Sequence, residues 1–374
     1  MTNRPDLAVL VASLYDGGVG KMRVRLMNEI VRRGYTVDLV TARSDSPYMK
    51  QLSPAIRVVP IGTTHALTGV PALARYLWST RPRVMLSQRT RVNVLALRAR
   101  TLARSGTRMF LTVNVNLTSK LDAVGGRKRE KGLAQLRKYF PRNDGIIAVS
   151  RGVADDVARL LGWPPERIRV APNPTVTPAI YEAAKMPLDH PWFTSGEVPV
   201  FLGVGRLVPE KDFANLLHAF AKVRATRHCR LVILGEGPER PKLLALSAKL
   251  GLADDAQLPG FVDNPYAYMA RASVFVLSST REGLPNALTE ALAVGVPVVS
   301  TDCPNGPYEI LEAGRHGPLV PVGDSEALAA AMTATLEHPT ERAARQAAAQ
   351  RYTVERSASV YLEAMGFAAA GAAT

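Results

Sequence analysis

The strongest constraint on the fold of this chain is an alternation of short apolar runs with longer segments of helical periodicity. In the first half the apolar runs are LAVLVASL, TVDLVTA, VMLSQ, MFLTVNV and GIIAVS, and segments such as MRVRLMNEIVRRG lie between them. Short apolar runs of this kind are typical of buried parallel strands, and the segments between them of covering helices. The pattern predicts a doubly wound α/β domain.

The alternation stops between residues 173 and 199, where a stretch rich in proline and polar residues predicts a linker. A second series of apolar runs follows: PVFLGVGRL, CRLVILGEG, AQLPGFV, ASVFVLSS and VPVVSTD. We therefore expect two Rossmann-like domains, at residues 1–175 and 195–350, that face each other across a cleft. An amphipathic helix at about residues 353–370 is expected to pack back on the first domain.

The charge of the chain is concentrated in its first half. Residues 1–150 contain 26 Lys and Arg against 8 Asp and Glu, whereas the remainder contains 21 against 24. This asymmetry favours an anionic partner for the first domain, either lipid headgroups, a nucleic acid or a phosphate ligand, with ordinary solvated arginines as the alternative. No nucleic-acid recognition motif accompanies the charge, so we do not expect nucleic-acid binding.

Uninterrupted apolar stretches are short throughout the chain, and the N-terminal segment carries Asp6. We therefore expect neither a membrane-spanning helix nor a signal peptide, and a cytoplasmic protein fits best. Cys229 and Cys303 lie far apart, which argues against a disulfide framework or a metal cage. The adjacent Asp155 and Asp156 are interpreted as solvated charge rather than as metal ligands. We therefore expect no metal, and no other motif predicts a cofactor.

The most informative motif is REGLPNALTEALAVGVPVVSTD, residues 281–302, which follows an apolar strand. It places Glu282 in a loop before a helix that begins near Pro285, with Glu290 on the same helix. Backbone N–H groups at a helix start bind anions, so a diphosphate would fit there while the two carboxylates hold sugar and ribose hydroxyls. An ordinary surface carboxylate is the alternative for Glu290. The backbone groups assigned to this site are those of Gly283, Leu284, Pro285, Asn286 and Ala287.

A second motif, GVGRLVPEKDF at residues 203–213, directly follows a predicted strand. Gly205 allows close approach of a ligand to the backbone. Arg206 can bind phosphate oxygens with its planar fork, and Lys211 supplies a second positive charge. A solvated basic pair is the alternative interpretation.

A third motif, LYDGGVGKMRV, lies between the first strand and the first helix. Gly17 and Gly18 let the backbone approach a phosphate at the start of that helix. The order Gly-Lys resembles a nucleotide-triphosphatase loop, but Met22 stands where Mg²⁺ coordination needs Ser or Thr, and Tyr15 stands in place of the leading glycine. We reject the triphosphatase interpretation.

Two further loops follow strands of the second domain. Gly235 and Gly237 in GEGPER are expected near the cleft, and the backbone of Phe261 and Val262 could contact a nucleobase. Tight turns without a ligand are the alternative.

Taken together, these motifs resemble the retaining glycosyltransferases of family 4, which have the GT-B fold. The resemblance runs from residue 16 to residue 324 and is most specific over residues 261–311. It implies that Arg206 and Lys211 bind the donor diphosphate, that Glu282 contacts the donor sugar and that Glu290 holds the ribose. We treat Glu282, Arg206 and Lys211 as the expected catalytic residues.

The resemblance has one departure. Many family members carry a histidine after the strand that corresponds to MFLTVNV, whereas this chain has Asn114 and Asn116. The first-domain catalytic contact is therefore unassigned, although an amide can still donate a hydrogen bond to a sugar hydroxyl. The loop at Gly17 and Gly18 resembles the first-domain loop of the family, which lies against the donor phosphates and the acceptor.

The resulting expectation is transfer of a hexose or N-acetylhexosamine from a nucleotide-diphosphate sugar, with UDP-sugars expected, to a polyprenyl-diphosphate-linked or other membrane-associated saccharide acceptor. Residues 302–311 are similar to enzymes of envelope and exopolysaccharide synthesis. The basic segment 125–140 is expected to bind the anionic inner face of the cytoplasmic membrane, or alternatively to dock on its own domain. A nucleotide-sugar epimerase or hydrolase, or a non-catalytic membrane adaptor, are the other functions considered.

Overall fold

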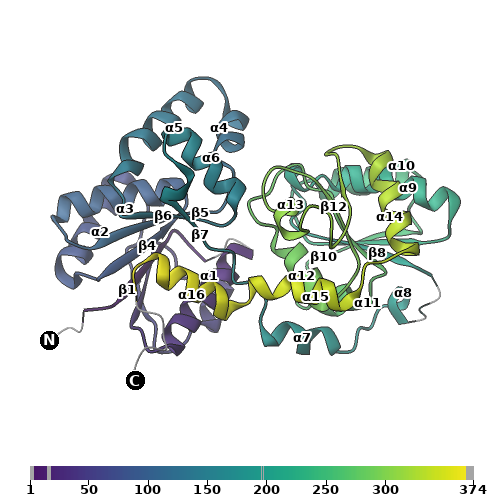
Figure 1. The fold of residues 1–374 in the computed structure, drawn as a ribbon, viewed down its shortest axis with the longest axis horizontal. Coiled ribbons are helices and arrows are strands. Elements are labelled where there is room, and N and C mark those ends of the chain that lie inside the picture. The colour runs from purple at the N-terminus through teal and green to yellow at the C-terminus, as the bar shows by residue number, and fades with distance from the viewer. Residues whose placement is uncertain (1–3, 15–17, 195, 197, 368–374) are drawn as a thin grey trace. The chain divides into compact units, whose positions relative to one another are not determined.

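The computed structural model describes residues 4–14, 18–194, 196 and 198–367. The chain divides into two compact units, called here the first domain (residues 1–174 with 354–374) and the second domain (residues 175–353). Each contains a parallel sheet with covering helices (Figure 1), which confirms the α/β class with two Rossmann-like domains.

In the described part of the first domain, seven parallel strands form one sheet in the order β3-β2-β1-β4-β5-β6-β7. The strands are β1 (Leu7–Val11), β2 (Val37–Thr41), β3 (Arg57–Pro60), β4 (Val84–Gln88), β5 (Arg108–Val113), β6 (Gly145–Ala148) and β7 (Ile168–Val170). The helices and 3-10 turns are α1 (Gly18–Arg32), η1 (Pro47–Gln51), α2 (Ala66–Thr80), α3 (Thr90–Ala103), α4 (Leu117–Val124), α5 (Gly126–Tyr139), η2 (Phe140–Arg142), α6 (Arg151–Leu161), η3 (Pro165–Arg167) and α16 (Val354–Ala364). Strands β1, β2 and β4 are buried along their whole length because helices cover the sheet on both sides.

The last helix of the chain, α16, completes the core of the domain in which the chain begins. Figure 1 shows α16 (yellow) beside α1, and the two helices pack on each other. Tyr361, Leu362 and Met365 are buried in the same apolar cluster as residues of β1. The C-terminal segment therefore stabilises the first domain.

Among the described residues of the second domain, six parallel strands form a sheet in the order β10-β9-β8-β11-β12-β13. The strands are β8 (Val200–Val204), β9 (Arg230–Leu234), β10 (Ala256–Gly260), β11 (Val274–Leu277), β12 (Val298–Thr301) and β13 (Leu319–Val320). The helices and 3-10 turns are α7 (Pro178–Lys185), α8 (Pro191–Thr194), η4 (Pro209–Lys211), α9 (Phe213–Thr226), α10 (Arg240–Lys249), α11 (Pro265–Arg271), α12 (Asn286–Val294), α13 (Pro307–Ile310), α14 (Ser325–Glu337), α15 (Arg342–Ala349) and η5 (Gln350–Tyr352). Counted from β8, this is the Rossmann order 3-2-1-4-5-6.

The stretch 173–199, predicted to be a linker, is instead folded into the second domain through α7 and α8. Ile180 is fully buried, and Trp192 and Phe193 are exposed by only 8% and 9%. Both helices begin at a proline, which is tolerated in the first helical turn. The prediction was wrong because the prolines start short helices here rather than interrupting structure.

Candidate functional site

The candidate site lies at the carboxyl ends of β8 and β11 in the second domain. These strands are neighbours in the sheet although β9 and β10 separate them in the sequence. The order of the strands thus reverses between them, and in open α/β sheets ligands bind at such a switch point. The loop after β8 carries Arg206 and Lys211, and the loop after β11 carries Glu282.

Lys211 and Glu282 form an ion pair at this point. Ser279 Oγ donates a second hydrogen bond to the same Glu282 oxygen at 2.8 Å. Ser278 Oγ donates to the Lys211 carbonyl at 2.8 Å and so links the two loops. The side chains of Lys211 and Glu282 are 24% and 11% exposed, so the pair is partly shielded but reachable from solvent.

A second ion pair joins the same two loops, between residues adjacent in sequence to the first pair. Arg281 Nη2 lies 2.5 Å from Glu210 Oε1, and the Thr280 N–H donates to the Glu210 carbonyl at 2.9 Å. The Arg281 hydrogen bond holds the pKa of the Glu210 carboxyl below its ordinary value, and the nearby positive charge of Arg206 acts in the same direction. Arg206 itself is exposed and available to a ligand.

Two glycines beside the candidate site, Gly235 and Gly237, are required by the backbone. Gly235 has φ +136°, and a Cβ there would lie 1.9 Å from the Gly205 carbonyl oxygen. Gly237 has φ +159°, and a Cβ there would lie 2.3 Å from the Leu207 carbonyl oxygen. The Gly205 N–H donates to the Leu234 carbonyl at 3.0 Å. The loops after β8 and β9 therefore pack backbone against backbone, which only glycine permits.

Helix α12 begins at Asn286, one residue after Pro285. Gly283, Leu284 and Pro285 are buried before the helix, whereas Asn286 and Ala287 are partly exposed in its first turn. This segment packs tightly, since a Cβ on Gly306 would lie 2.6 Å from Pro285 Cδ.

Glu290 lies in the second turn of α12 and accepts a hydrogen bond from Tyr266 Oη at 3.0 Å. This hydrogen bond ties the Glu290 carboxylate to the neighbouring helix α11, which carries Tyr266. At the carboxyl end of β10, Phe261 is 70% exposed and Val262 is partly buried. An exposed aromatic ring in this loop suits contact with a planar base.

The two cysteines are buried and are not bonded to each other. Cys303 follows β12 behind the ion pair, and burial, with a smaller effect of the Glu282 charge, raises the pKa of its thiol to about 12. In the described part of the chain, no three His, Cys, Asp or Glu side chains gather as a metal site.

In the first domain, the predicted glycine loop is only partly described. Gly18 is the first residue of α1, whereas Gly17 lies outside the described residues. Asn116 caps α4, because its Oδ1 accepts from the Ser119 N–H at 2.7 Å. Asn114 differs: both polar atoms of its side chain are buried without a hydrogen-bond partner. Of the two asparagines, Asn114 has the uncommitted amide.

Sequence reasoning missed Arg23, a charged residue of α1 that is only 1% exposed. Its Nε donates to Gln88 Oε1 at 2.5 Å, and its Nη2 donates to Thr112 Oγ1 at 2.7 Å. Its guanidinium carbon also lies 5.5 Å from the centre of the Tyr361 ring. Nη1 is buried without a partner. No sequence signal marks this position, because Arg23 is one of several arginines in an amphipathic helix.

The structure bears on two surface expectations. In the segment 125–140, Leu136 is 2% exposed and Phe140 is fully buried, which agrees with the alternative that this segment docks on its own domain. The basic residues Arg127 and Lys128 are exposed. Asp156, interpreted as solvated charge, is 1% exposed and accepts from the first N–H groups of α4 at 2.6 and 3.1 Å. Unpaired N–H groups at a helix start explain why a carboxylate is buried there.

Two parallel α/β domains, one with a charged site at its switch point, define the GT-B fold class, and solved structures agree. HepE of Anabaena, solved with UDP and glucose, has a TM-score of 0.77, 18% identity, and coverage of 96% of this chain and 98% of its own. The lipopolysaccharide outer core galactosyltransferase WaaB has a TM-score of 0.75 and 19% identity, with the same coverage of both chains. At this identity the similarity shows the fold.

The family follows from the sequence of each domain. Residues 17–174 match the family described as "Glycosyl transferase 4-like domain", and residues 198–338 match "Glycosyl transferases group 1". The chain therefore belongs to the family 4 type of glycosyltransferases with a GT-B fold.

Two of the similar curated proteins are glycosyltransferases with informative names. The lipopolysaccharide core biosynthesis glycosyltransferase LpsE of Rhizobium meliloti is 36% identical over 194 residues, 52% of this chain and 54% of LpsE. An N-acetylgalactosaminyltransferase of Campylobacter jejuni, whose name specifies a diphospho-undecaprenol-linked acceptor, is 32% identical over 198 residues, 53% of this chain and 52% of the relative. The chain thus spans about half the length of these relatives.

Proposed function

We propose that this chain transfers a hexosyl or N-acetylhexosaminyl group from a nucleotide-diphosphate sugar, with UDP-sugars as the expected donors, to a lipid-linked saccharide of an envelope polysaccharide. The observation that carries the proposal is the Lys211–Glu282 ion pair at the switch point of the second sheet, with Arg206 exposed beside it. The glycosyltransferase family matches and the polysaccharide-related names of the relatives support the reaction class.

The donor diphosphate would bind at Arg206 and Lys211. A lysine ammonium has three N–H donors, so Lys211 can keep Glu282 and still donate to phosphate oxygens. Arg206 adds a planar fork that suits two oxygens of one phosphate. Negative charge grows on the diphosphate as its bond to the sugar breaks, and fixed cations stabilise that charge. No metal is required in this scheme.

The reaction forms one bond and breaks one. The acceptor hydroxyl oxygen bonds to the anomeric carbon as the bond from that carbon to the diphosphate oxygen breaks, on the same face of the sugar. The hydroxyl proton passes to the departing diphosphate, which leaves as the nucleoside diphosphate. Glu282 would hold donor-sugar hydroxyls, and Glu290, fixed by Tyr266, would hold the ribose.

The central experiment compares wild-type protein with the Glu282→Gln variant, using a radiolabelled UDP-sugar and a membrane extract as acceptor source. We expect label in the lipid fraction with the wild type and a loss of about 10²–10³-fold in the variant, the effect of removing a group that acts on the transition state. Glu326→Gln is the matched control, since Glu326 also pairs with a lysine but is 79% exposed on α14.

Each alternative function gives a different result. Label that stays in a changed free sugar would indicate an epimerase or hydrolase, and no turnover with any donor would leave only a binding role. Equal rates for wild type and Glu282→Gln would remove Glu282 from the mechanism. Retention is tested separately, because the anomeric proton coupling of the isolated product must match that of the donor.

The membrane part of the proposal rests on charge rather than on insertion. Leu136 of α5 is buried in its own domain and the basic residues of this helix are exposed, so we expect electrostatic attraction to anionic lipids rather than insertion. In the described part of the chain, no helix is both long and apolar enough to cross a bilayer. We expect cosedimentation with phosphatidylglycerol vesicles to weaken with salt and with neutralisation of Arg127, Lys128 and Lys131; undiminished binding would contradict it.

A further inference from the structure

A hollow of about 810 Å³ lies at the amino-terminal edge of the first sheet, where α2 and α3 end and β5 begins. Within this domain it is at the opposite edge of the sheet from the carboxyl ends of the strands. Its size suits a small organic ligand. It is called here the arginine hollow, after four of its lining residues: Arg4, Arg75, Arg81 and Arg104.

The four arginines differ from others at the same edge of the sheet. Arg83 pairs with Asp6 at 3.1 Å, and Arg100 pairs with Asp144. The lining of the arginine hollow contains no acidic side chain, and within residues 4–14, 18–194, 196 and 198–367 no carboxylate pairs with its four arginines. Their charge is therefore not balanced by protein side chains.

Helix ends explain only part of this charge. Arg81 and Arg104 cap α2 and α3 in the left-handed conformation, where a cation interacts favourably with the helix C-terminus. Each C-terminus carries about half a negative charge, so two helices leave about three of the four positive charges uncompensated. Arg75 lies in the second half of α2 and also lines the hollow.

Apolar side chains stand beside these charges. Trp78 is 65% exposed and Leu102 is 60% exposed, and both line the hollow together with the buried Leu77. An exposed tryptophan next to arginines is typical of a site that receives a molecule with one apolar and one charged end.

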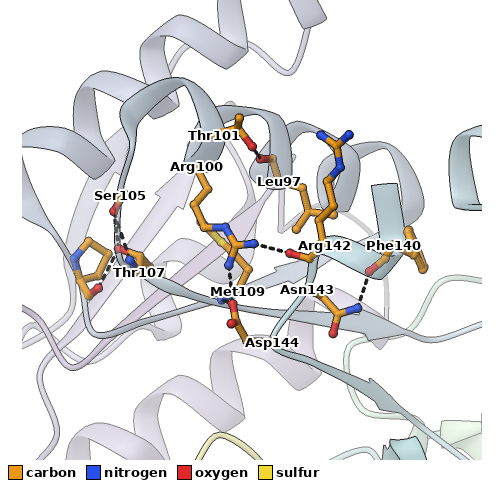
Figure 2. Close-up of polar contacts among 11 residues, drawn as sticks. Leu97, Arg100, Thr101, Ser105, Thr107, Met109, Phe140, Arg142, Asn143 and Asp144 are labelled. Carbon is orange, nitrogen blue, oxygen red and sulfur yellow. Dashed lines mark hydrogen bonds and ion pairs between the residues drawn. The ribbon is translucent and has the colours of Figure 1, made fainter. Parts of the chain in front are cut away.

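Hydrogen bonds hold the loop between α3 and β5, which lines part of the hollow (Figure 2). Thr107 Oγ1 donates to the Pro82 carbonyl at 2.8 Å and lies 2.9 Å from Ser105 Oγ. Next to this loop, Asp144 accepts from the Met109 N–H at 2.7 Å and binds Arg100. The loop between α3 and β5 is thus shaped before any ligand arrives, which lowers the entropy cost of binding.

We propose that the arginine hollow binds a phosphate-bearing amphiphile, with the phosphate on the arginine forks and the apolar part covering Trp78 and Leu102. A guanidinium group can bind two oxygens of one phosphate or one carboxylate. A carboxylate can be bound by a single arginine, so four arginines favour the more highly charged phosphate. This site is separate from the donor site of the second domain and does not depend on the transferase reaction. A membrane phospholipid or a soluble phosphorylated lipid could supply the same chemistry.

Fluorescence of Trp78 provides the test, because Trp192 is buried and Trp163 stacks under Arg167 at 3.9 Å. Monomeric dihexanoyl phosphatidic acid should shift the emission to shorter wavelength, and Trp78→Phe should abolish the shift. Dihexanoyl phosphatidylcholine, without net charge, and inorganic phosphate, without chains, should bind at least tenfold more weakly. Vesicles containing phosphatidic acid distinguish a membrane lipid from a soluble one.

The matched pair of variants is Arg75→Gln and Arg98→Gln, which neutralise exposed arginines of α2 and α3 inside and outside the hollow. We expect Arg75→Gln to weaken the binding of phosphatidic acid about tenfold and Arg98→Gln to leave it unchanged. Equal binding by both variants, an unshifted Trp78 at saturating ligand, or equal affinity for inorganic phosphate would overturn the proposal. Neutralising α5 should leave binding of the monomeric lipid intact, which separates this site from the vesicle binding proposed for that helix.

Discussion

The two domains have the same strand order around their switch points, but they place charge there differently. In the second domain, Lys211 and Glu282 form a pair that remains 24% and 11% exposed. In the first domain, Arg23 is 1% exposed near the ends of β4 and β5 and donates hydrogen bonds to two neutral side chains, Gln88 and Thr112. One domain offers a reachable ion pair at its edge, and the other encloses a cation.

This difference indicates that the strand order sets where a site can form, whereas the side chains at that place determine whether a ligand can bind. A partly exposed ion pair can exchange some of its contacts for those of a ligand at little cost, because water already screens it. A buried guanidinium cannot, because every lost hydrogen bond leaves a polar group without water. We therefore assign donor chemistry to the second domain and a structural role to Arg23.

The largest expected effect is on turnover. Lys211→Met removes the cation that both holds Glu282 and faces the diphosphate, so we expect kcat to fall about 10²–10³-fold. Arg206→Met should cost less, about tenfold, because Arg206 is exposed and its interaction with phosphate is screened. Steady-state transfer of labelled sugar measures both variants.

Lys222→Met is the control for Lys211, since Lys222 also pairs with a glutamate, Glu326, but on the surface of α9. It should retain wild-type kcat. A larger fall in kcat for Arg206→Met than for Lys211→Met would contradict this prediction. Arg206 rather than the ion pair would then contribute most to turnover.

The second effect concerns stability of the first domain. Arg23→Leu leaves Gln88 and Thr112 without their donors and removes the cation over the Tyr361 ring, so we expect a loss of about 2–4 kcal/mol in unfolding free energy. Thermal unfolding should show a transition lower by roughly 5–10 °C. Arg98→Leu, at an exposed position of α3, should change it by less than about 1–2 °C. An unchanged transition in Arg23→Leu would mean that the hydrogen bonds and the ring contact of Arg23 make no net contribution to stability.

The sequence predicted the repeated strands well because most of the apolar runs are buried, as in β1 and β4. It also identified Lys211 and Glu282 as neighbours, because both follow strands and parallel strands end at one edge. It missed the pair Glu210–Arg281, whose residues are 71 positions apart and show no pattern. Burial of Arg23 could not be predicted either, since an arginine in an amphipathic helix ordinarily faces water.

The third prediction compares two glycine variants, one that strains the backbone and also disturbs loop packing and one that only strains the backbone. Gly235→Ala places a Cβ 1.9 Å from the Gly205 carbonyl oxygen and must move the loop after β8, so we expect nucleotide affinity to fall and stability to drop by about 2–3 kcal/mol. Gly251→Ala has a positive φ of +71° but meets nothing within 4 Å, so it should cost about 1 kcal/mol and leave affinity unchanged. Calorimetric titration with UDP and urea unfolding provide the two numbers. Equal affinity losses would show that the contact with Gly205 is not what shapes the site.

The smallest effect reports on the charge of the ion pair itself. The pKa of the Cys303 thiol is raised from 9.0 to about 12, mainly by burial; Glu282 raises it further and Lys211 lowers it. The folded protein therefore keeps this proton between about pH 9 and 12, where the unfolded chain releases it, so ionisation of the thiol opposes folding in that window. Removing one partner of the pair should move the thiol pKa in a direction set by the lost charge.

In a Cys229→Ser background, Glu282→Gln should lower the Cys303 pKa and Lys211→Met should raise it. At pH 9.5 the rate of alkylation by iodoacetamide follows the thiolate fraction, so it should increase a fewfold in the first variant and decrease in the second. Peptide mass spectrometry measures both rates, and circular dichroism confirms that the variants stay folded at that pH. Burial slows the reagent equally in both, so opposite changes can come only from charge. Rates that change in the same direction would show that the variants loosen the packing around Cys303, and the ion pair would then be a structural feature like Arg23 rather than its functional counterpart.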